Sequence, residues 1–361
     1  MRVAFLWNGI SGYYNACLKE LANRNGTELF VCHEALHESA PFDEGQFAWM
    51  KKRIAWRTRK DLGNLEQELH EFEPDVVIFA SWNKPVYRAI AKSFEGKAWR
   101  VMGMDNCWLG TLKQRVGTWI APFYVRPLAD AVWLPGERQA VFAKKLGFES
   151  KVVMRGSYTC DQQPIAEAYQ KRLADGRALP HSFLFVGRFA PEKGVRTLVK
   201  AYEIYRKRSA DPWPLVCCGT GPLQSVLENR EGISIGGFVQ PDRLPAILAS
   251  AGCFVLPSEF EPWALVVHEA TSAGLPVIAS DRVGAAVHLV QPNYNGFIFG
   301  SGDTESLADL MLRVSGMSNA RLESMSQASY QMSQQFSPTR WVDTLFDSYA
   351  ALWQSRNTRE S

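Results

Sequence analysis

Short apolar runs alternate with amphipathic helical stretches along the first half of the chain. RVAFLW leads into the loop NGISGYY and then into a helical pattern, NACLKELANR. Later strands are predicted at ELFVCH, DVVIFAS, WRVMGMD, AVWLPG and KVVMRG. Strands that alternate with helices favour parallel sheets covered by helices.

The same alternation starts again in the second half. Strands are predicted at SFLFVGR, PLVCCGTG, ISIGGFV, CFVLPS and PVIAS. Residues 156–181 are polar, with a proline near each end, and predict a linker. We therefore predict an α/β protein with two Rossmann-like, doubly wound domains, 1–155 and 182–337, facing a central cleft. A helix at about 338–357 is a candidate to pack back on the first domain.

Composition narrows the class of protein. The chain of 361 residues is 46% hydrophobic and 21% charged, which is typical of a globular protein. A net charge of +3 is too small to favour nucleic acid as a partner. The seven cysteines are scattered without a C-x-x-C spacing, and no signal peptide or membrane-spanning run stands out. The predicted location is the cytoplasm, with peripheral contact on the inner face of a membrane as an extension.

Two glycine-rich loops follow predicted strands of the second half. FVGRFAPEKG places Arg188 and Lys193 beside Gly187, and CGTGPL contains Gly219 and Gly221. Cations and free backbone N–H groups at a strand end suit a diphosphate. The alternative is that both cations are solvated and that the glycines only form turns.

The stretch EFEPWALVVHEA carries a carboxylate at each end of an apolar run, Glu261 and Glu269. Pro262 predicts the first turn of a helix, which leaves the N–H groups of Ala264, Leu265 and Val266 facing an anion. In a helix the two glutamates would lie about 12 Å apart, roughly the distance from a ribose to a hexose across a diphosphate. The alternative is that Glu261 caps the helix and Glu269 pairs with a cation.

Taken together, FVGRFAPEKG, CGTGPL, GGFV, LPSEFEPWALVVHEATSAGLPVIAS and NGFIF resemble the donor domain of GT-B glycosyltransferases, specifically family 4, over about residues 182–300. The resemblance implies that Arg188 and Lys193 neutralise the leaving diphosphate, that Glu269 binds the ribose and that Glu261 contacts the transferred sugar. It also implies that backbone around Gly237–Val239 holds the base, flanked by Gly219 and Gly221.

Several positions depart from the family pattern. The family usually has Phe where this chain has Trp263 and Gly where it has Ala264. It commonly has Gly and Glu where this chain has Ala285 and His288. These residues belong to the sugar pocket in the resemblance, so they put the identity of the donor sugar in doubt.

Metal and cofactor are separate questions. The chain contains no D-x-D, the usual ligand pair for a divalent ion on a nucleotide sugar. We therefore predict no metal site and no cofactor, with a nucleoside-diphosphate sugar, UDP or GDP in type, as co-substrate.

The first half is expected to bind the acceptor. In the resemblance, the loop NGISG closes over the donor phosphates, so Gly9 and Gly12 are candidates, with a simple turn as the alternative. Asp105 and Asn106 follow a predicted strand and are candidates to bind or orient the acceptor hydroxyl. Asp105 is also the best-placed general base, should the enzyme be inverting.

The segment Lys51–Lys60 has six basic residues, no acidic ones and one tryptophan. It is a candidate to contact a phosphate-bearing lipid or an anionic membrane surface. The alternative is a solvated helix face whose Trp56 packs inward.

The sequence as a whole predicts a retaining, metal-independent hexosyltransferase that acts on a glycan or a lipid-linked glycan, in cell-surface polysaccharide biosynthesis. Two alternatives stay open: an epimerase on the same fold, and a catalytically silent nucleotide-binding regulatory protein.

Overall fold

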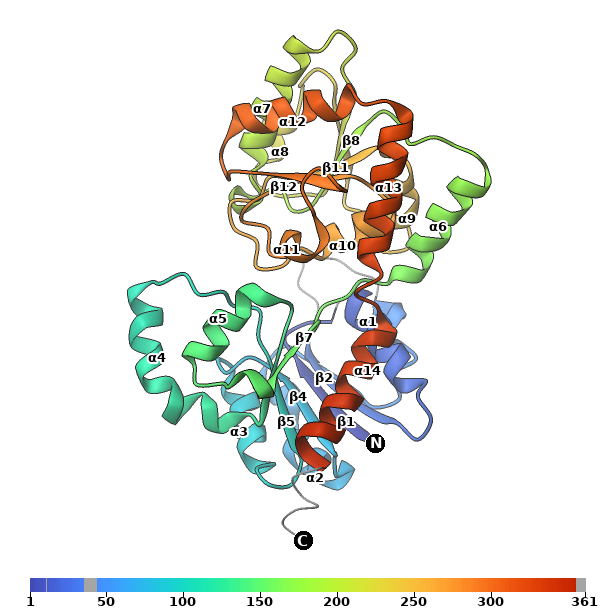
Figure 1. The fold of residues 1–361 in the computed structure, drawn as a ribbon. Helices are drawn as coiled ribbons and strands as arrows, with labels where there is room; N and C mark the ends of the chain where they lie inside the picture. Colours follow the sequence, from blue (N-terminus) through green and yellow to red (C-terminus); the bar gives the residue numbers. More distant parts are fainter. Residues whose placement is uncertain (11, 36–43, 355–361) are drawn as a thin grey trace. The chain divides into compact units, whose positions relative to one another are not determined.

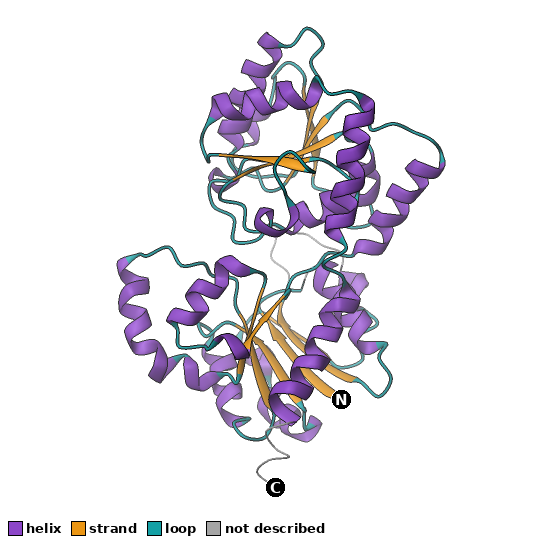
Figure 2. Cartoon of the chain, in the orientation of Figure 1, coloured by secondary structure: helices purple, strands orange, loops and turns teal. Residues whose placement is uncertain are grey.

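The computed structural model describes residues 1–10, 12–35 and 44–354. The chain forms two compact units. Unit 1 contains residues 1–159 and the segment that begins at Phe336, and unit 2 contains Cys160–Gln335. Each unit is built on a parallel sheet with helices around it (Figure 2), so the predicted fold class of two Rossmann-like α/β domains is confirmed.

The sheet of unit 1 has seven strands in the order β3-β2-β1-β4-β5-β6-β7. Their bounds are β1 Arg2–Trp7, β2 Glu28–Glu34, β3 Arg53–Trp56, β4 Val76–Ala80, β5 Trp99–Gly103, β6 Ala131–Leu134 and β7 Val153–Arg155. All neighbouring pairs are parallel. The strand order reverses between β1 and β4, and ligands of such sheets bind beyond the carboxyl ends of the strands at this point.

Six α-helices belong to the described part of unit 1. They are α1 Gly12–Ala22, α2 Leu65–Phe72, α3 Pro85–Ser93, α4 Leu112–Tyr124, α5 Glu137–Lys145 and α14 Pro338–Tyr349. The last of these is far from the others in sequence, yet its Trp341 stacks on Trp133 of β6 with ring centroids 4.4 Å apart. The indole N–H of Trp341 also donates to the carbonyl oxygen of Ser157, at 3.1 Å. Helix α14 therefore supplies part of the core of unit 1 (Figure 1).

The sheet of unit 2 has six parallel strands in the order β10-β9-β8-β11-β12-β13. Their bounds are β8 Phe183–Val186, β9 Leu215–Cys218, β10 Ile233–Gly237, β11 Cys253–Leu256, β12 Val277–Ser280 and β13 Gly296–Phe299. The helices are α6 Gln162–Ala174, α7 Val195–Arg208, α8 Gln224–Leu227, α9 Leu244–Ala249, α10 Leu265–Ser272, α11 Ala286–Leu289, α12 Thr304–Ser315 and α13 Asn319–Ser333. The predicted linker at 156–181 is wrong over most of its length, because α6 lies within it and belongs to unit 2.

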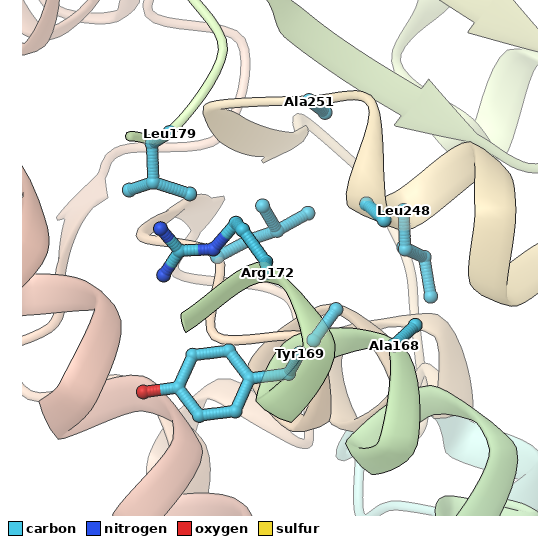
Figure 3. A pocket seen from close by; sticks show the side chains of 9 residues that line it. Ala168, Tyr169, Arg172, Leu179, Leu248 and Ala251 are labelled. Atoms are coloured by element: carbon cyan, nitrogen blue, oxygen red, sulfur yellow. The ribbon is translucent and has the colours of Figure 1, made fainter. Parts of the chain in front are cut away.

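A small, mostly apolar hollow in unit 2 is lined by α6, α9 and the residues between α10 and β12 (Figure 3). Arg172 points into it, but its guanidinium is already bound by the carboxylate of Glu323 through two hydrogen bonds of 2.9 and 2.7 Å. All of the described lining residues lie outside the predicted site. We therefore assign this hollow to the packing of α6.

The basic segment Lys51–Lys60 is not a helix. Its first part is strand β3, and its end enters a 3-10 turn at Arg59–Leu62. Trp56 is buried and its indole N–H donates to the Tyr87 hydroxyl at 3.3 Å, so its predicted inward packing is correct. The predicted helix face is wrong, because the segment continues the sheet from β2.

Candidate active site

The loop after β8 and the loop after β9 are joined along their backbones. The N–H of Gly187 donates to the carbonyl oxygen of Cys218 at 2.9 Å, and the N–H of Phe189 to that of Thr220 at 2.8 Å. Gly219 in turn donates to the carbonyl oxygen of Gly237, at the end of β10, at 2.6 Å. The three loops predicted to surround the nucleotide are thus hydrogen-bonded to one another at the carboxyl ends of their strands.

Gly219 and Gly221 are required by this close packing. Their φ angles are +144° and +154°, which L side chains rarely adopt. A Cβ at Gly219 would lie 1.9 Å from the carbonyl oxygen of Gly187, and one at Gly221 would lie 2.6 Å from that of Phe189. The two glycines therefore allow the neighbouring loop to approach, whatever contact they make with a ligand.

A second junction places Lys193 next to the loop after β11. Gly194 has a φ of +67°, and a Cβ there would lie 2.0 Å from the carbonyl oxygen of Pro257. The N–H groups of Glu259 and Phe260 both reach the carbonyl oxygen of Glu192, at 2.8 and 3.2 Å. The turn before α7 is thereby fixed against the segment that leads to Glu261.

This junction forms an ion pair between Lys193 and Glu261, 68 residues apart. Their side chains are 19% and 11% exposed. Arg188, in contrast, is 62% exposed and pairs with Glu192 of the same turn at 2.6 Å. The two predicted cations therefore lie on one loop, one largely buried on Glu261 and one open to solvent.

Helix α10 begins at Leu265, so the predicted helix start at Pro262 is wrong. The preceding segment instead pairs with the loop after β12. Glu261 forms a bridge with Val283, and the N–H of Gly284 donates to the carbonyl oxygen of Glu261 at 3.0 Å. Leu265 and Val266 lie in the first turn of the helix, but only part of the stretch from Glu261 to Glu269 is helical, so the estimate of about 12 Å from helical rise does not apply.

The residues that depart from the family pattern lie together. The N–H of Ala285 donates to the carbonyl oxygen of Trp263 at 2.7 Å. The ring of Trp263 is buried and packs on the ring of His288, with centroids 5.7 Å apart. Changes at these separate sequence positions therefore belong to one packing unit next to Glu261.

Ala264 precedes α10 with φ +82° and ψ +81°, a left-handed conformation that costs an L-residue about 1–2 kcal/mol. We expect Ala264→Gly to leave the protein at least as stable as the wild type, because relief of this strain offsets the greater entropy that glycine has in the unfolded chain. Chemical denaturation of both proteins would measure the difference. Ala270→Gly, in the middle of α10, is the control and should destabilise. A loss of 1 kcal/mol or more in Ala264→Gly would contradict the expectation.

Glu269 lies in the second turn of α10 and is partly buried. Burial raises the pKa of its carboxyl group to about 7, and the negative charge of Asp161, just before α6, acts in the same direction. Both protonation states of Glu269 are therefore populated near neutral pH. Asp161 is a neighbour that the sequence patterns did not indicate.

The residue before Glu269, His268, links α10 to both ends of unit 2. Its Nδ1 accepts a hydrogen bond from the N–H of Cys160 at 3.2 Å, and its Nε2 is 3.1 Å from the carbonyl oxygen of Ser333. One ring nitrogen must accept and the other must donate, which requires the neutral tautomer protonated on Nε2. The helix that carries Glu269 is thus fixed to the first and last segments of its unit.

In unit 1, Asp105 follows β5 and Gly12 is the first residue of α1, so this helix begins earlier than the predicted NACLKELANR. The hydroxyl of Tyr158 donates to the Asp105 carboxylate at 3.1 Å. The rings of Tyr13 and Tyr14 pack on Tyr158, with centroids 5.5 and 5.8 Å away. The Tyr-Tyr pair directly after NGISG is the sequence signal that could have indicated this cluster.

The other predicted residues lie in loops of their own units. Gly9 lies between β1 and α1, and Asn106 follows Asp105 as an exposed residue. Val239 is half-buried beyond the end of β10. The roles of these three residues stay predictions.

Comparison with known proteins agrees with this geometry. Residues 178–332 match the family model described as "Glycosyl transferases group 1". The match covers most of unit 2, including both glutamates, both cations and the glycine loops. Unit 2 is therefore similar over most of its length to the domain that this family model describes.

Among curated proteins, the chain is similar to the O-antigen chain mannosyltransferase B of Escherichia coli, with 30% identity over 173 residues (44% of this chain, 43% of the relative). It is also similar to the alpha-D-kanosaminyltransferase of Streptomyces kanamyceticus, with 26% identity over 211 residues (55% and 54%). The chain thus spans about half of the length of these relatives.

Among solved structures, Anabaena Alr3699/HepE in complex with UDP matches 97% of this chain and 100% of its own, with a TM-score of 0.71 and 18% identity. The lipopolysaccharide outer core galactosyltransferase WaaB, in its apo form, matches 97% and 99% with a TM-score of 0.68 and 17% identity. These likenesses establish the GT-B fold.

Two further properties bear on the sequence predictions. None of the helices in the described residues has both the length and the apolar character needed to cross a bilayer. Likewise, the described residues contain no group of three His, Cys, Asp or Glu side chains arranged to hold a metal ion.

Proposed function

We propose that the protein is a retaining, metal-independent glycosyltransferase that moves a hexose-type sugar from a nucleoside-diphosphate sugar to a glycan or lipid-linked glycan. The observation that carries this proposal is the pairing of Lys193 with Glu261 between two loops at the carboxyl end of the unit 2 sheet. A cation and a carboxylate held there, within a domain that matches group 1 glycosyltransferases, suit a diphosphate and the sugar attached to it.

In this proposal Lys193 and Arg188 bind the departing diphosphate. The bond between the anomeric carbon and the diphosphate oxygen breaks, and the acceptor oxygen bonds to the same face of the sugar. The acceptor proton passes to an oxygen of the leaving diphosphate, so no protein base is required for retention. Before donor binds, Glu261 balances the charge of Lys193, and on binding it turns to the hydroxyls of the sugar.

Glu269 is proposed to accept hydrogen bonds from the ribose hydroxyls, with Gly237–Val239 next to the base. Trp263 and Ala264 would shape the sugar pocket, and the first turn of α10 would face the phosphates. Asp105, held by Tyr158, is proposed to bind the acceptor. Gly9 and Gly12 would close over the donor phosphates.

The names of similar proteins favour this substrate class. They include an O-antigen mannosyltransferase and an amylovoran biosynthesis glycosyltransferase, AmsK of Erwinia amylovora, and the Anabaena structures hold UDP or UDP-glucose. We therefore propose a UDP- or GDP-sugar as donor and cell-surface polysaccharide biosynthesis as the setting, in the cytoplasm. Contact between Lys51–Lys60 and an anionic membrane stays a prediction.

A screen of UDP-, GDP- and ADP-sugars for thermal stabilisation tests the donor site. A ligand at 100 times its dissociation constant adds about 2.7 kcal/mol to the free energy of unfolding, so the true donor should raise the melting temperature by several degrees. The nucleotide sugar that raises the melting temperature is then incubated with the protein, with and without glycan acceptors. Transfer that needs a chelatable metal would contradict metal independence, and an altered sugar released without any acceptor would indicate an epimerase. A protein stabilised by no nucleotide sugar would overturn the proposal.

A further inference from the structure

Large apolar side chains gather on the exposed surface of one helix, α4. Of the twelve exposed large hydrophobic residues among those described, seven lie between Leu109 and Tyr124. Five of them recur at i, i+4, i+7, i+8 and i+11, which places them on one side of the helix, and form what we call the α4 face: Leu112, Val116, Trp119, Ile120 and Phe123. Trp119 and Phe123 are 85% and 86% exposed. An exposed apolar patch of this kind marks an interaction surface.

The orientation of α4 is the reverse of that of an ordinary surface helix. Such a helix turns its apolar stripe to the core and its polar residues to water. In α4 the buried residue is Ala121, while small or polar residues such as Gly117 and Thr118 are half-buried. Figure 1 draws α4 at the outer edge of its unit. The fold thus presents the apolar stripe outward.

Charge on and around α4 has one sign. Residues 106–129 contain no aspartate or glutamate but do contain Lys113, Arg115 and Arg126. Arg88 of α3 lies over the ring of Tyr124, at 5.0 Å from its centroid. Lys145 of α5 lies over the ring of Trp108, just before α4, at 4.6 Å. The apolar face is therefore bordered by cations without matching acids in its own segment.

These features fit an anionic lipid surface better than a second copy of the chain. Helices that lie in a bilayer interface combine a Trp/Phe/Leu face with Lys and Arg at its border. The ring of Trp119 and the hydroxyl-bearing Tyr124 suit the headgroup region, where one end of a side chain is apolar and the other wet. A two-fold dimer through α4 would bring the cations that border both copies together without acidic partners in the segment, and like charges would oppose association.

We propose that the α4 face is a membrane-contact surface that places Trp119 and Phe123 in the headgroup region of an anionic bilayer. This contact is separate from the donor chemistry of unit 2 and does not depend on the proposed function. It also differs from the sequence-based expectation, which assigned membrane contact to Lys51–Lys60. That segment joins the sheet at β3, whereas α4 connects β5 to β6.

Co-sedimentation with lipid vesicles tests the proposal. The full chain is mixed with vesicles of phosphatidylcholine alone, or of equal parts phosphatidylcholine and phosphatidylglycerol. We expect binding to the anionic vesicles, and Trp119→Ser/Phe123→Ser should weaken it by about tenfold or more, since two large apolar groups leave the interface. Lys113→Glu/Arg115→Glu should also weaken it, and added salt should weaken wild-type binding.

The matched control is Leu173→Ser/Tyr294→Ser, two exposed apolar residues of unit 2 that should leave vesicle binding unchanged. Because Trp119 and Phe123 are exposed, unfolding curves of all variants should match that of the wild type. The proposal is overturned if the wild type does not bind anionic vesicles. It is also overturned if Lys51→Glu/Lys52→Glu abolishes vesicle binding while Trp119→Ser/Phe123→Ser does not weaken it. Light scattering that finds a dimer lost in Trp119→Ser/Phe123→Ser would also overturn it, in favour of a second copy.

Discussion

Lys193→Ala should lower the rate of sugar transfer at saturating donor by roughly two to three orders of magnitude, the usual effect of removing one group that stabilises charge in a transition state. The backbone at Lys193 is fixed by the junction of the turn before α7 with the loop after β11. We therefore expect that no neighbouring segment can easily supply its positive charge in the same place. A kinetic assay with the donor found by thermal screening would measure the loss. Lys200→Ala, an exposed lysine of α7, is the matched control and should keep full activity.

The same substitution should lower the free energy of unfolding by about 3 kcal/mol, because it leaves Glu261 largely buried without its counter-charge. The double variant Lys193→Met/Glu261→Gln removes both charges and should recover most of that stability while staying inactive. The comparison separates the effect of the substitution on stability from its effect on the rate of transfer. Full activity in Lys193→Ala, or in Glu261→Gln, would refute the site assignment.

Glu269→Gln should make the protein more stable at pH 8 and weaken nucleotide binding. The pKa of Glu269 in the folded protein is about 7, above the ordinary value of 4.5. Between pH 4.5 and pH 7 the folded state therefore holds a proton that the unfolded state has lost. The stabilisation of the folded state that results is fully present below pH 4.5 and is lost as the pH rises through 7. At pH 8 the charged carboxylate costs on the order of 3 kcal/mol, which the neutral amide avoids.

Unfolding of wild type and Glu269→Gln between pH 4 and pH 8 would measure this effect. The two should be similar at pH 4, and the variant should gain as the pH rises. Nucleotide affinity at pH 8 should fall by about tenfold or more, because the amide replaces one charged acceptor of the ribose hydroxyls. Asp161→Asn should lower the pKa of Glu269 and shift the stability profile to lower pH. A stability difference that does not change with pH would contradict the assignment of this pKa.

The strands were predictable because buried parallel strands are short, continuous apolar runs. RVAFLW and SFLFVGR correspond closely to β1 and β8. Helix α6 escaped prediction because its inward positions include Gln162 and Arg172, which form hydrogen bonds with distant residues instead of continuing an apolar stripe. Pro164 reinforced the linker interpretation, although proline is tolerated in a first helical turn.

The candidate site was also predictable only in part. Arg188, Lys193, Glu261 and Glu269 were indicated only when the loop segments and the E-x7-E stretch were taken together, and their roles stay predictions. Their partners were not indicated, because the pairing of Lys193 with Glu261, the approach of Asp161 to Glu269 and the hydrogen bond from Tyr158 to Asp105 all depend on loops that meet only in the folded chain. The start of α10 was misplaced for the same reason, since residues 261–263 pair with a loop some twenty residues later.

The stacking of Trp341 on Trp133 has a consequence for the order in which the units form during synthesis. Unit 2 is continuous in sequence, so every residue of its core has been made once the ribosome passes Gln335. Unit 1 must wait for Trp341, Val342 and Leu345, which belong to its core but are made more than 150 residues after β7. Domains generally fold as units while the chain grows. The half of the protein that leaves the ribosome first is therefore the half that completes its fold last.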